Sequence, residues 1–211
     1  MTINDELRKY GVVPVVVLDD SKDALPLAKA LVDGGLPCAE VTFRTSAAKE
    51  AIHLIVEEYP DMLVGAGTVL NIEQAKDAIN VGAKFIVSPG FDDDLVRYCK
   101  ENNIPVFPGV VTPTEVMKAL KYDLKVLKFF PAENYGGLAT IKALSAPFNN
   151  IQFMPTGGIN SKNIKDYLTN NKIIACGGSW MVKKELINEG KFDVIESLVK
   201  EAVSIVKEIR G

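Results

Sequence analysis

Short hydrophobic runs alternate with amphipathic stretches along the sequence. The first run, Val12 to Leu18, is apolar at consecutive positions, as in a strand buried on both faces. Asp19-Asp20-Ser21 then precedes an amphipathic stretch that reaches Asp33 and stops at Gly34-Gly35, which predicts a capped helix. The same strand-then-helix unit recurs after this one, and a short helix is predicted before it.

Eight such units can be assigned. The predicted strands span residues 12–18, 38–42, 62–66, 84–88, 104–107, 125–130, 151–154 and 173–176. The predicted helices span residues 21–33, 46–59, 92–101, 114–121, 138–144, 161–169 and 193–210, with a further one that begins at Asn71. Strands that alternate with helices pair in parallel through right-handed crossovers, and eight even units can close into a barrel. We therefore expect an α/β fold, a single-domain (β/α)8 TIM barrel over residues 1–211.

The competing fold is an open, doubly wound parallel sheet. Such sheets often carry a glycine-rich dinucleotide or phosphate loop after the first strand. The first strand here is followed by Asp19-Asp20-Ser21 instead, and the eight units are similar in size. No linker or low-complexity segment divides the series, so one barrel domain is the better prediction.

Composition and charge narrow the classes of partner. Hydrophobic residues make up 47% and charged residues 24% of the chain, with a formal net charge of −3, which gives no basic field for nucleic acid or anionic lipid. No apolar run has membrane-spanning length, and the acidic N-terminus does not resemble a signal peptide. Cys38, Cys99 and Cys176 are widely spaced, as expected of reduced thiols. We expect a cytoplasmic protein with no nucleic-acid and no membrane partner.

Lys128 interrupts the hydrophobic run Val126-Leu127-Lys128-Phe129-Phe130. Taken alone, this lysine is best explained as a strand residue whose ammonium reaches solvent, as Lys125 can also do. An apolar setting, however, favours the uncharged amine of a lysine, which is the form that attacks a ketone. Which explanation holds depends on the residues at the ends of the other strands.

Further polar residues are expected at the carboxyl ends of the predicted strands, where (β/α)8 enzymes hold their active sites. Glu40 lies within the second strand and Arg44 just beyond it; Glu40 is either a general base or the partner of a core cation. Thr68 offers a hydroxyl in the small-residue turn after the third strand. Pro89, after the fourth, is either a turn residue or an apolar wall of a pocket.

Two glycine pairs follow the last two strands. Gly157-Gly158 comes after Thr156, and Gly177-Gly178 comes before Ser179. Each pair alone is a weak signal, but together they can direct backbone N–H groups at one shared place, where a barrel commonly binds phosphate. Lys128 then lies between this phosphate site and Arg44, and Schiff-base chemistry becomes the better explanation for it.

Motifs spread over nearly the whole chain resemble those of the 2-keto-3-deoxy-6-phosphogluconate (KDPG) and 4-hydroxy-2-oxoglutarate (KHG) aldolases. They are Glu40-Val41-Thr42-Phe43-Arg44-Thr45, Gly65-Ala66-Gly67-Thr68-Val69, Ser88-Pro89-Gly90, Lys128-Phe129-Phe130-Pro131-Ala132-Glu133, Pro155-Thr156-Gly157-Gly158-Ile159 and Gly177-Gly178-Ser179-Trp180. The resemblance implies a class I aldolase of the Entner-Doudoroff pathway, a homotrimer that cleaves KDPG to pyruvate and glyceraldehyde 3-phosphate and needs no cofactor and no metal.

The resemblance also implies a role for each matching residue. Lys128 is the Schiff-base lysine and Glu40 the acid/base, while Arg44 and Thr68 hold the pyruvate carboxylate. Phe130 and Pro89 wall the pyruvate methyl group. The distal end and its phosphate are bound by Thr156, Gly157, Gly158, Gly177, Gly178 and Ser179. One departure is Asp19-Asp20, where some family members carry a basic residue after the first strand.

Three other functions remain open. An aldolase for the galactonate-derived epimer, or for unphosphorylated KHG, uses the same motifs. A phosphosugar isomerase or epimerase explains the phosphate site and Glu40 but leaves Lys128 without a role. A phosphometabolite-binding barrel without activity explains the phosphate site but leaves Lys128, Glu40 and Arg44 without a role. The sole histidine, His53, lies in a predicted helix and is expected to be structural or at the surface.

Overall fold

The computed structural model describes residues 2–211, which form α/β secondary structure throughout. The elements in chain order are α1 (Ile3–Tyr10), β1 (Val12–Val16), η1 (Ser21–Asp23), α2 (Ala24–Asp33), β2 (Cys38–Thr42), α3 (Ala48–Glu58), β3 (Leu63–Gly67), α4 (Ile72–Asn80), β4 (Ile86–Val87), α5 (Asp93–Glu101), β5 (Val106–Phe107), β6 (Gly109–Val110), α6 (Pro113–Leu120), β7 (Val126–Phe129), η2 (Glu133–Tyr135), α7 (Gly137–Ser145), β8 (Gln152–Pro155), α8 (Ile164–Leu168), β9 (Cys176–Gly178), α9 (Lys184–Asn188) and α10 (Phe192–Arg210).

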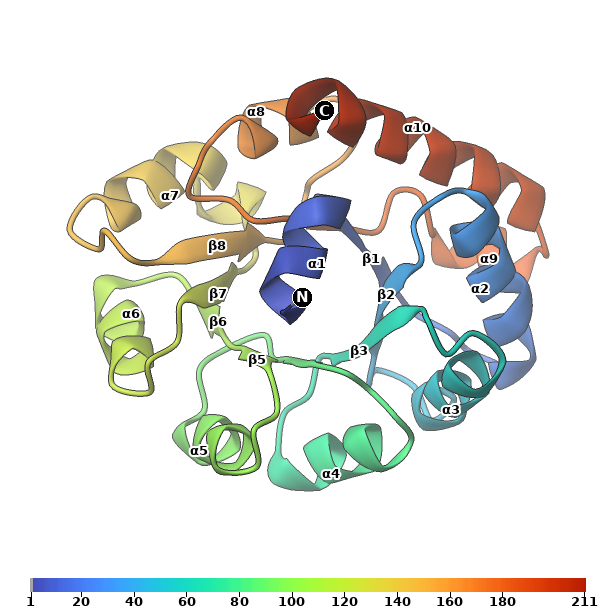
Figure 1. Cartoon of the computed structure of the whole chain (residues 1–211), viewed down its shortest axis with the longest axis horizontal. Coiled ribbons are helices and arrows are strands. Elements are labelled where there is room, and N and C mark those ends of the chain that lie inside the picture. Colours follow the sequence, from blue (N-terminus) through green and yellow to red (C-terminus); the bar gives the residue numbers. More distant parts are fainter. Residues whose placement is uncertain (1) are drawn as a thin grey trace.

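The strands are parallel and curl around a common centre, and the helices surround them (Figure 1). Six strands pair in the order β5-β4-β3-β2-β1-β9, and three pair in the order β6-β7-β8. Isolated parallel bridges, Phe153 to Ile173 and Thr156 to Gly177, lie between the β8 and β9 segments. The prediction of a single-domain α/β fold is therefore confirmed, with a curled parallel sheet, whereas closure into a (β/α)8 barrel stays a prediction because the strand ladder is divided between two sheets.

The predicted fifth strand, residues 104–107, is found as the shorter β5, which pairs with β4. Pro108 separates it from β6, a strand that was not predicted and that pairs with β7. Proline has no N–H to donate to a ladder, which is a physical reason for the break. The Pro108 carbonyl still accepts the Lys128 N–H at 3.0 Å, so the chain passes from one sheet to the next beside Lys128.

The predicted eighth strand, residues 173–176, is wrong in its bounds, because the paired strand β9 spans Cys176–Gly178. Arg210 of α10 explains the shift. Its guanidinium donates to the Ile173 carbonyl at 2.9 Å and to the Ile174 carbonyl at 2.5 Å. These carbonyls therefore bind a side chain instead of a neighbouring strand, and regular pairing with β1 begins at Cys176.

Most other predicted bounds differ by one to three residues, as helix ends do when capping decides them. The first strand ends at Val16 rather than Leu18, the fourth is limited to β4, and the helix predicted at 161–169 is the shorter α8. Helix α9 was not predicted. None of the helices within residues 2–211 combines the length and apolar character that crossing a membrane requires.

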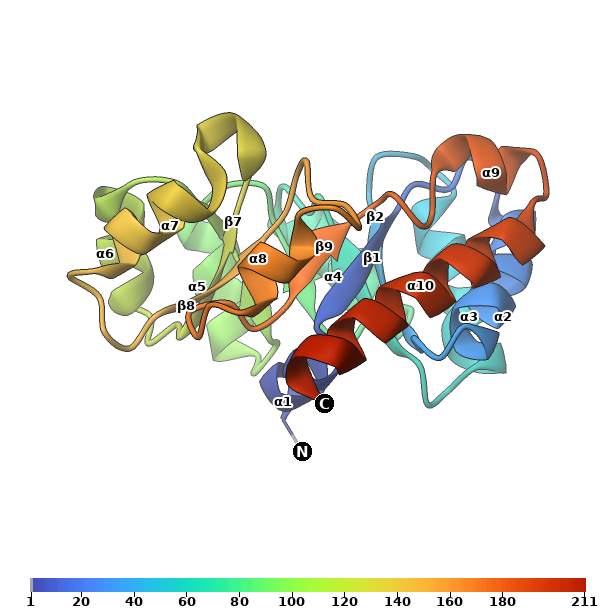
Figure 2. The ribbon, with the colours of Figure 1, turned by 90° about the horizontal axis from the view of Figure 1, so that it is seen from above.

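The N-terminal helix lies across one end of the strand assembly, where α1 is seen in front of the centre (Figure 1). Thr2 and Asp5 form a reciprocal capping box at its start, and Gly11 ends it in the left-handed conformation. At the long edge of the molecule α10 packs beside α2 (Figure 2). The carboxyl ends of the strands lie opposite α1, and α1 does not cover them. The candidate active site lies at these ends.

Candidate active site

A buried ion pair connects β2 with β7. The Nζ atom of Lys128 lies 3.2 Å from Oε1 of Glu40, with side-chain exposures of 4% and 0%. Both residues stand in strands whose every residue is buried, so apolar neighbours surround the pair. The other carboxylate oxygen, Oε2 of Glu40, is buried and makes no hydrogen bond within residues 2–211. A buried amine and a partly unsatisfied carboxylate are suited to nucleophilic attack and proton transfer.

Gly67 makes room for the carboxylate. A Cβ atom at Gly67 would lie 2.2 Å from Oε1 and 2.6 Å from Cγ of Glu40. Strand β3 pairs with β2 through Glu40 to Gly65 and Thr42 to Gly67, so Gly67 lies two residues beyond the partner of the glutamate. A glutamate side chain can occupy this space because the neighbouring strand presents no side chain there.

Arg44 and Thr68 meet beside this pair, as the sequence predicts for a carboxylate clamp. Nε of Arg44 donates to Oγ1 of Thr68 at 3.2 Å. Thr68 has a φ of 55°, a left-handed conformation that non-glycine residues adopt rarely and that often marks functional sites. Phe130 completes the arrangement, because its ring centroid lies 5.2 Å from Lys128 Nζ.

A cavity of about 420 Å³ extends from this group over the ends of β8 and β9. Of the predicted site residues, those that line it are Arg44, Phe130, Thr156, Gly157, Gly158, Gly177, Gly178 and Ser179. The structure thus brings the two glycine pairs and Arg44, far apart in sequence, to one cavity. Thr68 contacts Arg44 of this lining and Lys128 contacts Phe130, while Glu40 contacts Lys128.

Pro89 lies elsewhere. It lines a separate depression of about 220 Å³ together with Ser88, Phe91 and Val69. Its carbonyl oxygen would be 2.1 Å from a Cβ at Gly109, the residue that pairs with Lys128. The Pro89 backbone therefore lies against the residue that pairs with Lys128, and its role as a wall of the pyruvate methyl group stays a prediction.

The glycine loop after β8 presents unpaired backbone donors. Gly157 and Gly158 have φ values of 104° and 78°, and neither N–H group donates a hydrogen bond within the part of the chain that the structure describes. The carbonyl of Gly158, in contrast, accepts from the side-chain amides of Asn160 at 3.2 Å and Asn163 at 3.1 Å. The Gly158 carbonyl is therefore occupied by side-chain donors, while the N–H groups of Gly157 and Gly158 are available to bind an anion.

Two side chains with buried polar atoms lie against the second glycine pair. The hydroxyl of Thr156 would be 2.3 Å from a Cβ at Gly177, and the Trp180 ring would be 1.9 Å from one at Gly178. Neither Thr156 Oγ1 nor Trp180 Nε1 has a hydrogen-bond partner among residues 2–211. The glycines let these side chains approach the backbone closely, and Thr156 keeps a free hydroxyl in the cavity wall.

Sequence analysis missed a basic pair at the cavity. Lys183 and Lys184 follow the loop after β9, and both line the cavity of about 420 Å³. Nζ of Lys184 lies 2.9 Å from Oδ1 of Asp19, and this contact, with one from Asn188, lowers the pKa of Asp19. Lys183 has no such partner in the described chain, while Glu185 adds one negative charge. Two adjacent lysines after a glycine pair were a readable signal of an anion site.

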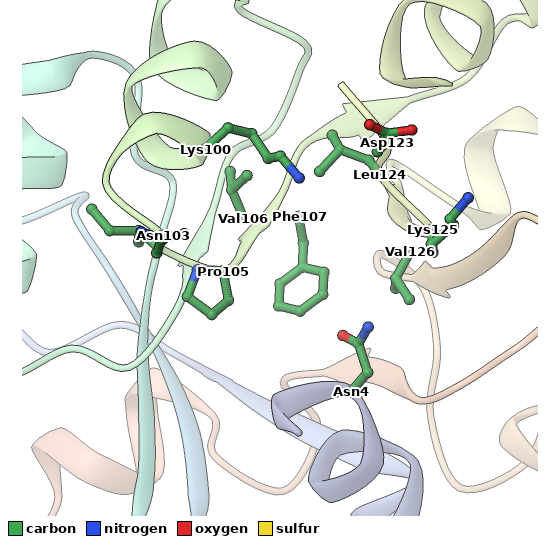
Figure 3. Close-up of a pocket in the computed structure, with 11 residues that line it drawn as sticks. Asn4, Lys100, Asn103, Pro105, Val106, Phe107, Asp123, Leu124, Lys125 and Val126 are labelled. Atoms are coloured by element: carbon green, nitrogen blue, oxygen red, sulfur yellow. The ribbon is translucent and has the colours of Figure 1, made fainter. Parts of the chain in front are cut away.

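A second cavity, of about 300 Å³, lies at the amino ends of β5 and β7 (Figure 3). Lys100, Asp123, Lys125 and Asn4 contribute polar groups to its wall. None of the residues assigned above to the site lines it, so the candidate chemistry is confined to the opposite ends of the strands. His53 is also remote from the first cavity: it lies on α3, with Nε2 3.6 Å from Glu57.

Metal ligation has no obvious place in this arrangement. Within residues 2–211, no group of three or more His, Cys, Asp or Glu side chains is gathered as a metal site. The polar groups at the cavity are instead an amine, a carboxylate, a guanidinium, hydroxyls and backbone N–H groups. This donor set suits a substrate that carries a ketone and two anionic ends.

Comparisons with known proteins agree with this chemistry. The family model described as KDPG and KHG aldolase matches residues 3–198. The chain is 46% identical over 206 residues to a 2-dehydro-3-deoxy-phosphogluconate aldolase of Treponema pallidum, covering 98% of each chain. It is 44% identical over 196 residues to the KHG/KDPG aldolase of Escherichia coli K12, covering 93% of this chain and 92% of that one.

A solved structure shares the fold closely. The KDPG aldolase of Legionella pneumophila superposes with a TM-score of 0.91 at 40% identity, covering 95% of this chain and 97% of that one. That structure holds pyruvate as a covalent carbinolamine intermediate. The similarity therefore extends over nearly the full length of both chains.

Proposed function

The chain belongs to the family of KDPG and KHG aldolases, and on that premise we propose that it cleaves KDPG reversibly to pyruvate and D-glyceraldehyde 3-phosphate by class I, Schiff-base chemistry. It is an aldehyde-lyase, and KHG, cleaved to pyruvate and glyoxylate, is the proposed second substrate, which the dual family name supports. The observation that carries the proposal is the Lys128 to Glu40 pair, a buried amine in contact with a buried carboxylate.

In the proposed reaction Lys128 Nζ attacks the C2 ketone and forms a carbinolamine, which loses water to give a protonated imine. Glu40 carries protons to and from this intermediate and removes the proton of the C4 hydroxyl. The C3–C4 bond then breaks, and its electron pair enters the imine as an enamine while glyceraldehyde 3-phosphate leaves. Glu40 returns a proton to the enamine carbon, and water releases pyruvate from Lys128.

The substrate is held at both ends in this proposal. Arg44 and Thr68 bind the pyruvate carboxylate, and Phe130 and Pro89 flank the methyl group. The free N–H groups of Gly157 and Gly158, with Thr156, Gly177, Gly178 and Ser179, surround the phosphate. Anchoring at both ends keeps the intermediates in place while one carboxyl serves several proton transfers.

We also propose that the strands close as a (β/α)8 barrel over one domain, residues 1–211. Support comes from β5 and β6, which follow each other directly, and from the two isolated bridges between the β8 and β9 segments. A homotrimer in the cytoplasm, acting in the Entner-Doudoroff pathway, remains a proposal based on family resemblance. Sedimentation velocity tests the trimer: a species of one-chain mass would contradict it.

Borohydride trapping tests the Schiff base. The protein is incubated with pyruvate and borohydride in the presence of EDTA, and the adduct is mapped by mass spectrometry. We expect one stable adduct on Lys128 and turnover that the chelator leaves unchanged. The absence of an adduct, or loss of turnover with EDTA, contradicts the class I mechanism. Lys125 is the internal control, since its side chain is exposed and no adduct is expected there.

Comparing kcat/KM for KDPG, its galactonate epimer and KHG separates the aldolase alternatives. The two sugar acids differ at one hydroxyl, and KHG lacks the phosphate tail. We expect both phosphorylated sugar acids to exceed KHG, because the cavity continues past the ketone site to the glycine pairs. We expect KDPG to exceed its epimer, because relatives with 46% and 47% identity to this chain are KDPG aldolases. A higher kcat/KM for the epimer would assign the galactonate activity instead.

A further inference from the structure

Glu133 and Tyr167 stand directly behind the glycine loop after β8. Glu133 begins the short helix η2 after β7, and Tyr167 belongs to α8. The Tyr167 hydroxyl donates a hydrogen bond to Oε1 of Glu133. Burial of the phenol, together with this hydrogen bond to a carboxylate, raises the pKa of Tyr167. The hydroxyl thus stays a donor, although neither residue lines the cavity that holds the site.

The Glu133 side chain touches the glycine that offers its N–H to the cavity. A Cβ atom at Gly158 would lie 2.5 Å from Cγ and 2.6 Å from Cβ of Glu133. The aliphatic part of the glutamate therefore fills the space behind Gly158. The carboxylate beyond it is turned to Tyr167 rather than to the loop N–H groups.

Backbone hydrogen bonds join the same two segments. The Ala132 N–H donates to the Thr156 carbonyl at 2.8 Å, and the Glu133 N–H donates to the Gly157 carbonyl at 3.1 Å. The segment that leaves the lysine strand thus lies against the loop that leaves β8. These bonds orient the carbonyls of residues 156 and 157 toward η2, on the side away from the N–H groups that remain free.

Asn160 and Asn163 hold the far side of this loop through the Gly158 carbonyl. Glu133 and Tyr167 hold the near side through packing against Gly158 and one side-chain hydrogen bond. A glycine pair with positive φ values is free to adopt many conformations unless its surroundings restrict it. The Glu133 to Tyr167 pair is therefore placed to restrict this loop.

We propose that Glu133 and Tyr167 are positioning residues that fix the Gly157-Gly158 loop in the conformation that binds the phosphate of the substrate. This inference rests on the proposed function and deepens it, because it predicts that the pair determines the preference for phosphorylated over unphosphorylated keto acids. The pair touches neither the amine nor the carboxylate of the reacting centre, so its effect is confined to the distal end.

The test compares Tyr167→Phe and Glu133→Ala with the unaltered protein on KDPG and on KHG. We expect KM for KDPG to rise about tenfold, the effect of one lost net hydrogen bond, with kcat within about twofold. Kinetics on KHG, which has no phosphate, stay within about twofold by the same reasoning. Glu133→Gln keeps an oxygen acceptor for the Tyr167 hydroxyl and restores KM for KDPG.

Tyr122→Phe is the matched control. Its hydroxyl donates to Asp93 at 3.1 Å, also a tyrosine-to-carboxylate bond, but between the turn after α6 and α5 rather than behind the loop. We expect it to leave KM for KDPG unchanged. Equal losses on KDPG and KHG, or an unchanged KM for KDPG in Tyr167→Phe and Glu133→Ala, contradict the proposal.

A second readout keeps the test decisive if Glu133→Ala folds poorly. Inorganic phosphate should inhibit KDPG cleavage less in Tyr167→Phe than in the unaltered protein, while inhibition by pyruvate stays equal; equal phosphate inhibition contradicts the proposal. Borohydride trapping on Lys128 distinguishes a failure of the proposed function from a failure of the positioning role. If the unaltered protein forms no adduct, the proposed function fails; if the adduct forms and phosphate effects are absent, only the positioning role fails.

Discussion

Gly67 and Glu40 share one space: a Cβ atom on the glycine would lie 2.2 Å from the glutamate Oε1. The backbone of β3 therefore decides where the proposed acid/base of β2 can stand. Because Oε1 is also the atom that contacts Lys128, a displaced carboxylate would alter the ion pair as well. The glycine is as necessary to the arrangement as the charged residues are.

Gly67→Ala should displace Glu40 and lower kcat by about a hundredfold, as misplacement of a reacting group by about 1 Å commonly does. The Schiff base with pyruvate should still form, since Lys128 is retained, and trapping measures this directly. Gly90→Ala is the steric control, because a Cβ there meets no atom within 4 Å. A variant at Gly67 with normal kcat would show that the Glu40 position is not critical.

Glu40→Gln should still form the imine with pyruvate but turn KDPG over slowly. The amide keeps the shape of the side chain and can still accept a bond from Lys128, but it cannot carry protons. We expect kcat to fall by about a hundredfold to ten-thousandfold, the usual contribution of general acid–base catalysis. Single-turnover kinetics beside the trapping assay check this. Unchanged turnover would remove Glu40 from the mechanism.

Lys183→Ala should raise KM for KDPG by about threefold, the scale of an exposed ion pair. The lysine lines the cavity without a partner in the described chain, and its charge favours a dianionic tail. The effect should shrink as salt is added. Lys191→Ala is the control, because that lysine pairs with Glu189 outside the cavity. Equal effects of the two substitutions would rule out a specific role for Lys183.

Glu115 at the start of α6 should make the stability of the folded protein depend on pH in the acid range. Partial burial alone raises the pKa of Glu115, but hydrogen bonds from the N–H groups of Val111 and Thr112 and from the Thr112 hydroxyl outweigh it and leave the pKa below its unfolded value near 4.5. A lowered folded-state pKa means that stabilisation is complete above the unfolded value and is lost as the pH falls through the folded one.

Urea unfolding of Glu115→Gln between pH 7 and pH 3 tests this. At neutral pH we expect a loss of about 0.5 kcal/mol, at the low end for helix caps because Glu115 is only partly buried. The difference from the unaltered protein should shrink as the pH falls and Glu115 becomes protonated. A difference independent of pH would contradict a role for the ionised carboxylate.

The three cysteines should be unreactive in the folded protein. Cys38, Cys99 and Cys176 are free and buried. Burial raises the pKa of the Cys99 thiol to about 11 and raises those of Cys38 and Cys176 further. Since the thiolate is the reactive form, a thiol reagent at pH 8 should label none before unfolding and all of them after it. Rapid labelling of the folded protein would show that a cysteine is exposed.

Much of this protein could be predicted from its sequence, because the signals are local or periodic. Consecutive apolar residues located β1, and the strand-to-helix alternation indicated parallel strands covered by helices. Parallel strands bring their carboxyl ends to one edge, so residues as distant as Arg44 and Ser179 could be expected together, and both line the same cavity. Lys128 was recognisable as an exception within an apolar run.

Only the tertiary structure decided which atoms meet. No local pattern shows that Gly67 clears the space of Glu40, that Asp19 pairs with Lys184 while Lys183 has no such partner within residues 2–211, or that Arg210 binds the carbonyls at which the eighth strand was expected. These contacts join residues distant in the chain, and their geometry depends on side-chain packing and strand register. The sequence by itself determined the chemistry available at the strand ends, and the fold determined its arrangement.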